Sequence, residues 1–180
     1  MWSARYTRVV RRVRKFVLDI DLSSQGIRES INRVREVEEW VSAKTDELMA
    51  RLANIGWQDA NINFMSVAPF YNNGNEMNAT ITVERVSERH YVIRASGEDV
   101  CFIEFGAGVT YGSGYPGVLP DGVVGIGQYG KGQGANPRGW NYPSGNGWKH
   151  TYGNPPAAGM FSAAQTIQQQ VYQIAQEVFS

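Results

Sequence analysis

The sequence predicts an α+β protein in which a long N-terminal helix and a C-terminal helix pack on a small antiparallel sheet. Three observations indicate this fold class. Apolar residues recur at three- and four-residue intervals early in the chain and again at its end, and two short segments between them alternate apolar and polar residues. At 180 residues the chain is long enough to bury its own core, so we expect a single domain spanning 1–180.

Composition and charge exclude several classes of protein. Hydrophobic residues make up 42% and charged residues 19%, which is typical of a globular chain. Seventeen basic and seventeen acidic residues cancel, so no overall field directs the protein to nucleic acid or to an anionic membrane. Residues 1–15 nevertheless form a basic arm, through which phosphates of DNA could be contacted. Its cations are Arg5, Arg8, Arg11, Arg12, Arg14 and Lys15.

Neither a signal peptide nor a membrane span is expected. Arginines interrupt the valines of the basic arm, and no apolar stretch approaches the roughly 20 residues that cross a bilayer. Cys101 is the single cysteine, which excludes an internal disulfide and is compatible with a reducing cytosol. We expect a soluble protein that stays where it is made.

The first elements are a short strand and a long helix. Alternating residues predict the strand near Phe16–Leu22, whereas the arm before it fits either a helix or an extended segment. Ser23 and Ser24 can cap a helix whose apolar stripe continues to Gly56, where glycine permits a left-handed end. About thirty residues would give a rod of roughly 45 Å, with a possible break near Ser42–Ala43. A helix of this length could line a neighbouring subunit.

A β-hairpin is expected next, after a turn-rich segment at 61–78. Thr80–Val86 and His90–Ala95 alternate in polarity and are joined by a turn at Ser87–Glu88. An apolar segment, Val100–Phe105, then leads to Gly106.

Residues 106–153 form the least ordinary segment. It holds fifteen of the twenty glycines together with seven tyrosines and tryptophans, and its prolines exclude a long helix. We predict a long loop without regular structure, and its aromatic rings favour a loop that becomes ordered against a partner.

The C-terminal helix is expected to start at Pro155–Pro156 and to continue to the end of the chain. Phe161, Ile167 and Ile174 belong to its apolar stripe. The opposite face is rich in glutamine, with Glu177 its only charge. Such an uncharged face favours contact with another chain, although a plain polar surface remains open.

No motif for catalysis, cofactor binding or metal binding is convincing, and we expect no enzyme. Gly125–Lys131 resembles the start of a phosphate loop, but Gly132 replaces the Ser or Thr of that motif and the following glycines and proline forbid the helix. His90, His150 and Cys101 lack the paired spacing of a zinc site. Glu104, among apolar neighbours, is expected to be structural, either accepting amides of the turn at 106–108 or pairing with an arginine.

Two short motifs resemble a known family. Phe102–Gly106 resembles the Y-x-E-F-G-T signature of the gene-product-ten-like tail-component family of long-tailed bacteriophages, which includes neck, tail-completion and tail-terminator proteins. Gly153–Phe161 resembles the second segment of that family, with Gly159-Met160 where proline is usual. Ala107 stands where threonine is common, and the glycine-rich insertion is longer than expected.

The resemblance implies a structural virion protein, assembled in the cytoplasm of a bacterial host. It would form a ring of six or twelve copies in the neck or at the head-proximal end of the tail and contact neighbouring neck and tail proteins. A glycan- or cell-wall-binding module of the virion that uses the aromatic loop is the alternative, and a nucleotide-binding enzyme is the third. The residues predicted to contact other subunits are Glu104, Phe105, Gly106, Tyr111, Tyr129, Trp140, Trp148, Gln169 and Gln173.

Overall fold

The computed structural model describes residues 23–71, 76–111, 114–118, 136–144 and 147–180. It is an α+β fold, as the sequence predicts, with helices and two small antiparallel sheets. The basic arm, the strand predicted near Phe16–Leu22, the phosphate-loop-like motif and Tyr129 lie outside the described residues.

The longest element is α1 (Ser24–Met65), whose 42 residues give a rod of about 63 Å. It begins where predicted, because the Ser23 hydroxyl accepts the Gly26 amide at 3.1 Å. It has no break near Ser42–Ala43, and the predicted end at Gly56 is wrong. A Cβ at Gly56 would lie 2.6 Å from Ile167 and 2.7 Å from Ile93, so this glycine admits close neighbours on the helix instead of ending it.

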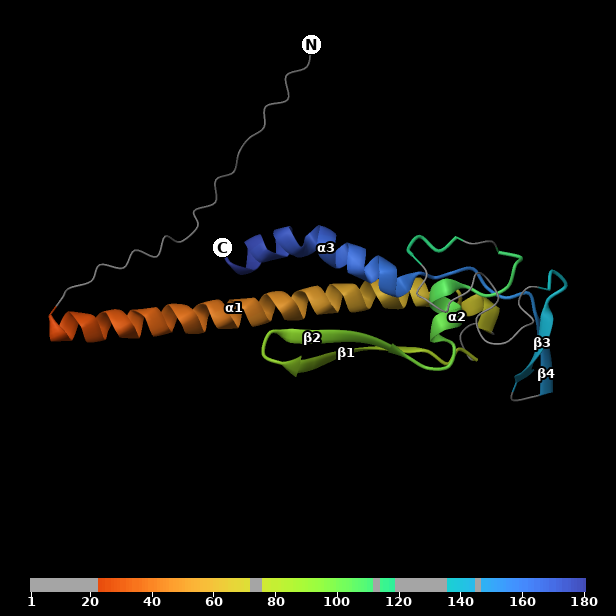
Figure 1. The fold of residues 1–180 in the computed structure, drawn as a ribbon, viewed down its shortest axis with the longest axis horizontal. Coiled ribbons are helices and arrows are strands. Elements are labelled where there is room, and N and C mark those ends of the chain that lie inside the picture. The colour runs from red at the N-terminus through yellow and green to blue at the C-terminus, as the bar shows by residue number, and fades with distance from the viewer. Residues whose placement is uncertain (1–22, 72–75, 112–113, 119–135, 145–146) are drawn as a thin grey trace, which may run out of the picture.

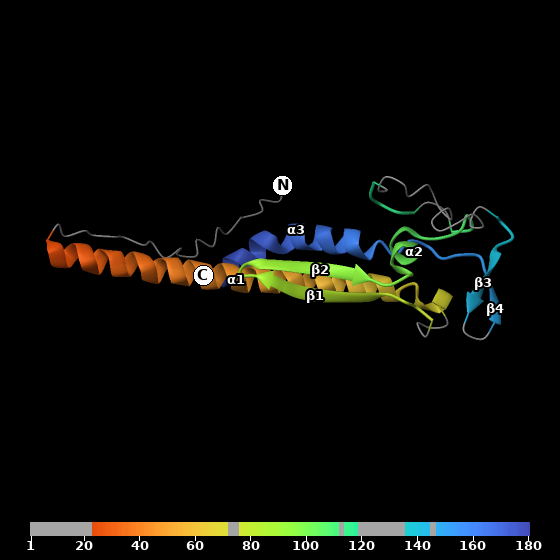
Figure 2. The ribbon, with the colours of Figure 1, turned by 60° about the horizontal axis from the view of Figure 1, so that its bottom comes forward.

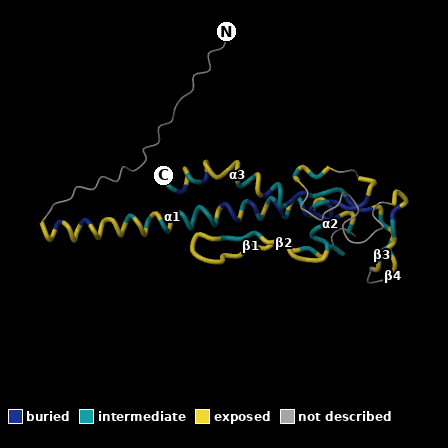
Figure 3. Tube along the Cα trace, in the orientation of Figure 1, coloured by how far each residue is buried: buried dark blue, intermediate teal, exposed yellow. Residues whose placement is uncertain are grey.

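Figure 1 shows α1 between α3 (Gly159–Val178) on one side and a hairpin of β1 (Thr80–Ser87) and β2 (His90–Ser96) on the other. Both packed elements lie along the C-terminal part of α1, and the N-terminal end of α1 projects beyond them (Figures 1 and 2). Most buried residues gather at the C-terminal part of α1 and where α2 and α3 join it, although Gly26 and Ser30 near the start of α1 are also buried (Figure 3). One core cluster consists of Leu52, Ile174 and Val178, and the other of Ala60, Phe64, Val67, Ile81, Ile103 and Ala163.

The predicted first hairpin is confirmed, with Thr80 opposite Ser96 and Val83 opposite Ile93. Its turn lies at residues 88–89, one position later than expected, and Arg89 has a left-handed φ of 59°. The Asp46 carboxylate of α1 accepts the Arg89 amide at 3.1 Å, which fixes the turn against the helix.

The chain after the first hairpin is more ordered than the sequence suggests. Val100–Phe105 forms a short helix, α2, and a second hairpin joins β3 (Trp140–Ser144) to β4 (Gly147–Thr151). The prediction that residues 106–153 lack regular structure is therefore wrong for this part of the segment. The turn-rich segment likewise starts inside α1 and contains a 3-10 helix, η1 (Ala68–Tyr71).

Candidate functional site

The two segments that carry the family resemblance meet in space, and we name their contact the motif junction (residues 102–107 with 153–161). Ala107 and Asn154 exchange two backbone hydrogen bonds of 2.9 Å. The Ala157 amide donates to the Ile103 carbonyl at 2.8 Å, and the Ala158 amide donates to the Glu104 carbonyl at 3.1 Å. Segments about fifty positions apart thus form one structural unit.

Glu104 closes this junction by capping α3. Its Oε2 accepts the Met160 amide at 2.9 Å and its Oε1 accepts the Phe161 amide at 3.1 Å. These are free amides of the first turn, where a carboxylate also meets the positive end of the helix dipole. The carboxylate is needed because Ala158, which precedes the helix, offers no side-chain cap. Glu104 is structural within the chain, but its amides come from α3 and not from the turn at 106–108.

Close packing at the motif junction explains why Gly106, Gly153 and Phe105 occupy their positions. Gly106 has a φ of +80°, and a Cβ on it would lie 2.8 Å from the Pro156 nitrogen. A Cβ on Gly153 would overlap the Ala107 carbonyl group. Phe105 packs edge to face on Tyr115 at a centroid distance of 5.0 Å, and the Tyr115 hydroxyl donates to Glu104 at 3.3 Å.

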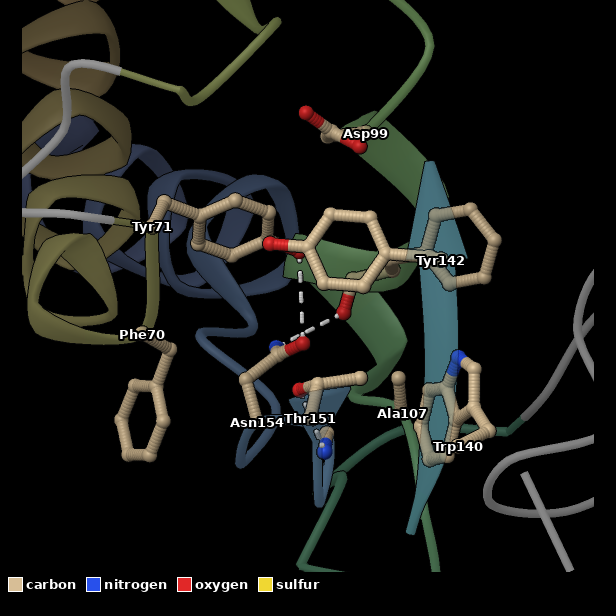
Figure 4. A pocket seen from close by; sticks show the side chains of 10 residues that line it. Phe70, Tyr71, Asp99, Ala107, Trp140, Tyr142, Thr151 and Asn154 are labelled. Atoms are coloured by element: carbon tan, nitrogen blue, oxygen red, sulfur yellow. Dashed lines mark hydrogen bonds between the residues drawn. The ribbon is translucent and has the colours of Figure 1, made fainter. Parts of the chain in front are cut away.

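Beside the motif junction lies an aromatic pocket of about 150 Å³. Figure 4 shows Tyr71 pointing toward Tyr142, with Asp99 on one side of them and Asn154 on the other. The pocket is lined by Phe70 and Tyr71 of η1, Asp99 and Phe102 at α2, Trp140 and Tyr142 of β3, and Ala107, Thr151, Gly153 and Asn154.

The electrostatics of the pocket reflect its partial exclusion of water. Desolvation raises the pKa of Asp99 above the ordinary carboxylate range, although a hydrogen bond from the Asn78 amide opposes the shift. Burial also raises the pKa of Tyr71, and the negative charge of Asp99 adds to this shift. Burial likewise raises the pKa of Tyr142, and there the charge of Glu76 adds to it. Both phenols therefore stay protonated at neutral pH.

The residues predicted to contact other subunits do not form one cluster. Trp140 lines the aromatic pocket, Tyr111 packs edge to face on Phe70 at 5.1 Å, and Trp148 is 76% exposed. Gln169 and Gln173 are exposed on α3, where Gln173 donates to Glu177 at 3.1 Å.

Sequence reasoning missed most of the pocket. Asp99 and Tyr71 carry no local motif, and their proximity depends on how η1 and the start of α2 lie in the fold. Trp140 and Tyr142 are two positions apart, the spacing that places side chains on one face of a strand, and that signal could have identified them.

The projecting part of α1 carries a second candidate contact surface. Leu48, Leu52 and Ile55 continue a stripe that α3 covers, and α3 ends where Phe179 meets Trp40 at a centroid distance of 5.8 Å. Four apolar residues of this stripe, at and before that point, are 41–50% exposed. We name this part the open seam, which consists of Ile27, Ile31, Val34 and Val41.

Other kinds of site find no support in the described part of the chain. No group of three His, Cys, Asp or Glu residues there could hold a metal ion, and no helix there is both long and apolar enough to cross a membrane. His150 instead pairs with Asn141 at 3.1 Å and packs on Tyr152, while Cys101 is a half-buried free thiol. Comparisons with protein-family models, curated proteins and solved structures give no match to this chain.

Proposed function

We propose that this chain is a structural subunit of an oligomeric ring in the virion of a tailed bacteriophage, in the neck or at the head-proximal end of the tail. The open seam is the observation that carries the assembly part of the proposal. Its four apolar side chains are separated by four, three and seven residues, which places them on one face of α1, and they continue the stripe that α3 covers. A helix from a neighbouring copy would extend the same packing.

Covering the open seam would supply part of the energy of such a contact. Full burial of an Ile or Val side chain stabilises by about 1.5–3 kcal/mol, and each seam residue is already about half buried. Covering the four residues would therefore contribute roughly 4 kcal/mol before the cost of association. Because association itself costs about 4–15 kcal/mol, a stable oligomer needs further contacts, which the repeated seams of a ring and the first hairpin would add.

The first hairpin supports the same conclusion. It is a two-stranded sheet among the described residues, so each strand keeps one edge without a strand partner. Val83 and Val86 on it are 40% and 51% exposed. Open edges and exposed apolar side chains on a short hairpin are suited to pairing with a neighbouring subunit.

The bacteriophage part of the proposal rests on the two motifs and on their meeting at the motif junction. In the resembled family these motifs flank a variable loop, and here their contact brings residues 107 and 154, on either side of the glycine-rich segment, together. A subunit of this kind has heterologous interfaces that close into a ring. Its partners are further copies of itself and the neighbouring neck and tail proteins.

Native mass spectrometry and negative-stain imaging of the purified chain test the assembly. We expect closed rings of six or twelve copies, and Ile31→Glu should shift the population toward the monomer. Asn32→Glu introduces the same charge beside the seam and serves as the matched control. A monomeric native chain, or equal effects of the two variants, would refute the role of the seam.

Location in the virion needs a separate measurement. An antibody raised against the chain should label the junction of head and tail on particles released from a host that carries its gene. Label on the capsid surface or the tail tip would contradict the proposed position without affecting the ring itself.

A further inference from the structure

The lining of the aromatic pocket has an unusual balance of groups. Five aromatic rings and one carboxylate surround it, whereas none of its lining residues is a lysine, arginine or histidine. The faces of aromatic rings carry negative potential, so the rings and the carboxylate both attract a positively charged ligand. The volume of about 150 Å³ is below the roughly 300–1,000 Å³ of sites for drug-sized ligands, so a small group is favoured.

Three neutral polar side chains of the pocket, those of Asn154, Tyr71 and Thr151, already form hydrogen bonds within the fold. Asn154 donates to the carbonyls of Phe102 and Pro155, each at 2.9 Å, and its Oδ1 accepts the Tyr71 hydroxyl at 3.3 Å. The Thr151 hydroxyl accepts the Gly153 amide at 3.0 Å. A sugar needs several free donors and acceptors around its ring, so this lining is poorly matched to one.

Asp99 is the one carboxylate among the residues that line the pocket. One oxygen accepts the Asn78 amide at 2.7 Å, but the carboxylate makes no ion pair with any described residue. Glu76 nearby pairs with Lys149, and Asp46 pairs with Arg85. A half-buried carboxylate without a counter-charge is stabilised by a cation that binds beside it.

We propose that the aromatic pocket binds an organic cation, an alkylammonium or guanidinium group, held by the ring faces and by Asp99. Cation–π attraction and a single counter-charge together are the features by which proteins recognise such groups. Two sources share this chemistry: a free alkylammonium compound, and an arginine or lysine side chain from another copy, whose residues 5–15 contain six cations. The inference does not depend on the proposed function.

A pair of ligands of the same shape tests the charge requirement. Saturation-transfer NMR on the full chain would compare choline with 3,3-dimethyl-1-butanol, its neutral isostere, and with glucose. We expect choline to bind with a dissociation constant on the order of 1 mM, as several modest cation–π contacts would give, and the neutral compounds at least tenfold more weakly. Equal binding of the isostere, preferential binding of glucose, or no choline binding at tens of times that concentration would overturn the proposal.

Variants on the second hairpin test whether the pocket is the site. Tyr142→Leu removes a ring face and should weaken choline binding about tenfold, whereas Tyr142→Phe keeps the face and should retain it. Trp148→Leu changes an exposed ring outside the pocket and should have no effect. The proposal fails if Tyr142→Phe and Tyr142→Leu are equivalent while both remain folded by circular dichroism.

Asp99→Asn preserves the shape of the side chain and should also weaken choline binding about tenfold. Because this variant leaves every ring in place, it keeps the test decisive if Tyr142→Leu does not fold. Unchanged choline affinity in Asp99→Asn would show that the Asp99 carboxylate does not hold the cation, and it would refute the proposal.

The source of the cation is found with a peptide of residues 4–15. Displacement of bound choline by this peptide assigns the pocket to the basic arm of another copy, and binding of choline without displacement assigns it to a free alkylammonium compound. The same peptide with every arginine and lysine replaced by glutamine is the control and should not displace choline.

Discussion

Glu104 gives the sharpest prediction on the stability of the fold. The residue is only 5% exposed. Its carboxylate accepts hydrogen bonds from two backbone amides at the start of α3, at 2.9 and 3.1 Å. Ala158 offers no alternative cap. We therefore predict that Glu104→Ala destabilises the protein severely and that Glu104→Gln, which keeps one oxygen acceptor, has a smaller effect.

The magnitude follows from the contacts. A hydrogen bond to a charged group contributes about 1.5–3 kcal/mol, and the carboxylate gains about 0.3–1 kcal/mol from the helix dipole. Loss of both amide bonds in Glu104→Ala should lower the free energy of unfolding by about 4 kcal/mol, with a melting temperature lower by roughly 12 °C for a chain of this size. Glu104→Gln loses the charge and one good acceptor, so we expect about 2 kcal/mol.

Urea unfolding followed by far-ultraviolet circular dichroism measures these differences. Glu84→Gln is the matched control, because Glu84 pairs with Arg94 at 3.5 Å and both side chains are more than half exposed. An exposed pair of this kind contributes less than about 1 kcal/mol. If Glu104→Ala costs less than 1 kcal/mol, or no more than Glu84→Gln, the carboxylate is not what holds the start of α3.

Two further predictions concern packing and ionisation. Gly56→Val should lower the free energy of unfolding by about 2 kcal/mol, because its side chain would meet Ile167 and Ile93, whereas the exposed Gln58→Val on the same helix should cost less than 1 kcal/mol in the same urea assay. Burial, reinforced by the Glu104 carboxylate, raises the pKa of Tyr115 to about 12. The folded protein therefore holds the Tyr115 proton more tightly than the unfolded chain does. The stability that this difference contributes is fully present below pH 10 and is lost as the pH rises from 10 to 12. The Tyr115→Phe variant should show a shallower loss in that range, and an unchanged slope would contradict the assignment.

Local signals in the sequence were sufficient for much of the fold. The serine before α1 caps it, the alternating segments form the first hairpin, and the apolar stripe of α3 is buried against α1. Each of these depends on residues close together in the chain. The end of α1 was mispredicted because Gly56 has two opposite uses, a helix end or a close contact, and only the neighbouring Ile167 and Ile93 decide between them.

The glycine-rich segment shows where composition stops being informative. Its glycines and prolines predict irregular structure, yet Trp140–Ser144 and Gly147–Thr151 pair as strands, with Pro143 opposite Trp148. Gly147, the first residue of β4, has a φ of +115°, a conformation that favours glycine. The alternation of Trp140 and Tyr142 was a strand signal hidden by the number of glycines around it.

The pocket and the motif junction depend on each other, and this dependence links the two proposals. Asn154 exchanges backbone hydrogen bonds with Ala107 at the junction, while its side chain accepts from Tyr71 and forms a wall of the pocket. A cation that holds the rings together would therefore also favour the arrangement in which α2 and the start of α3 are joined. If residues 5–15 of another copy supply that cation, assembly through the open seam and occupation of the pocket would strengthen each other, because both would bring the same neighbouring chain to the domain. Choline would then compete with the arm and weaken the oligomer, whereas 3,3-dimethyl-1-butanol would leave it unchanged.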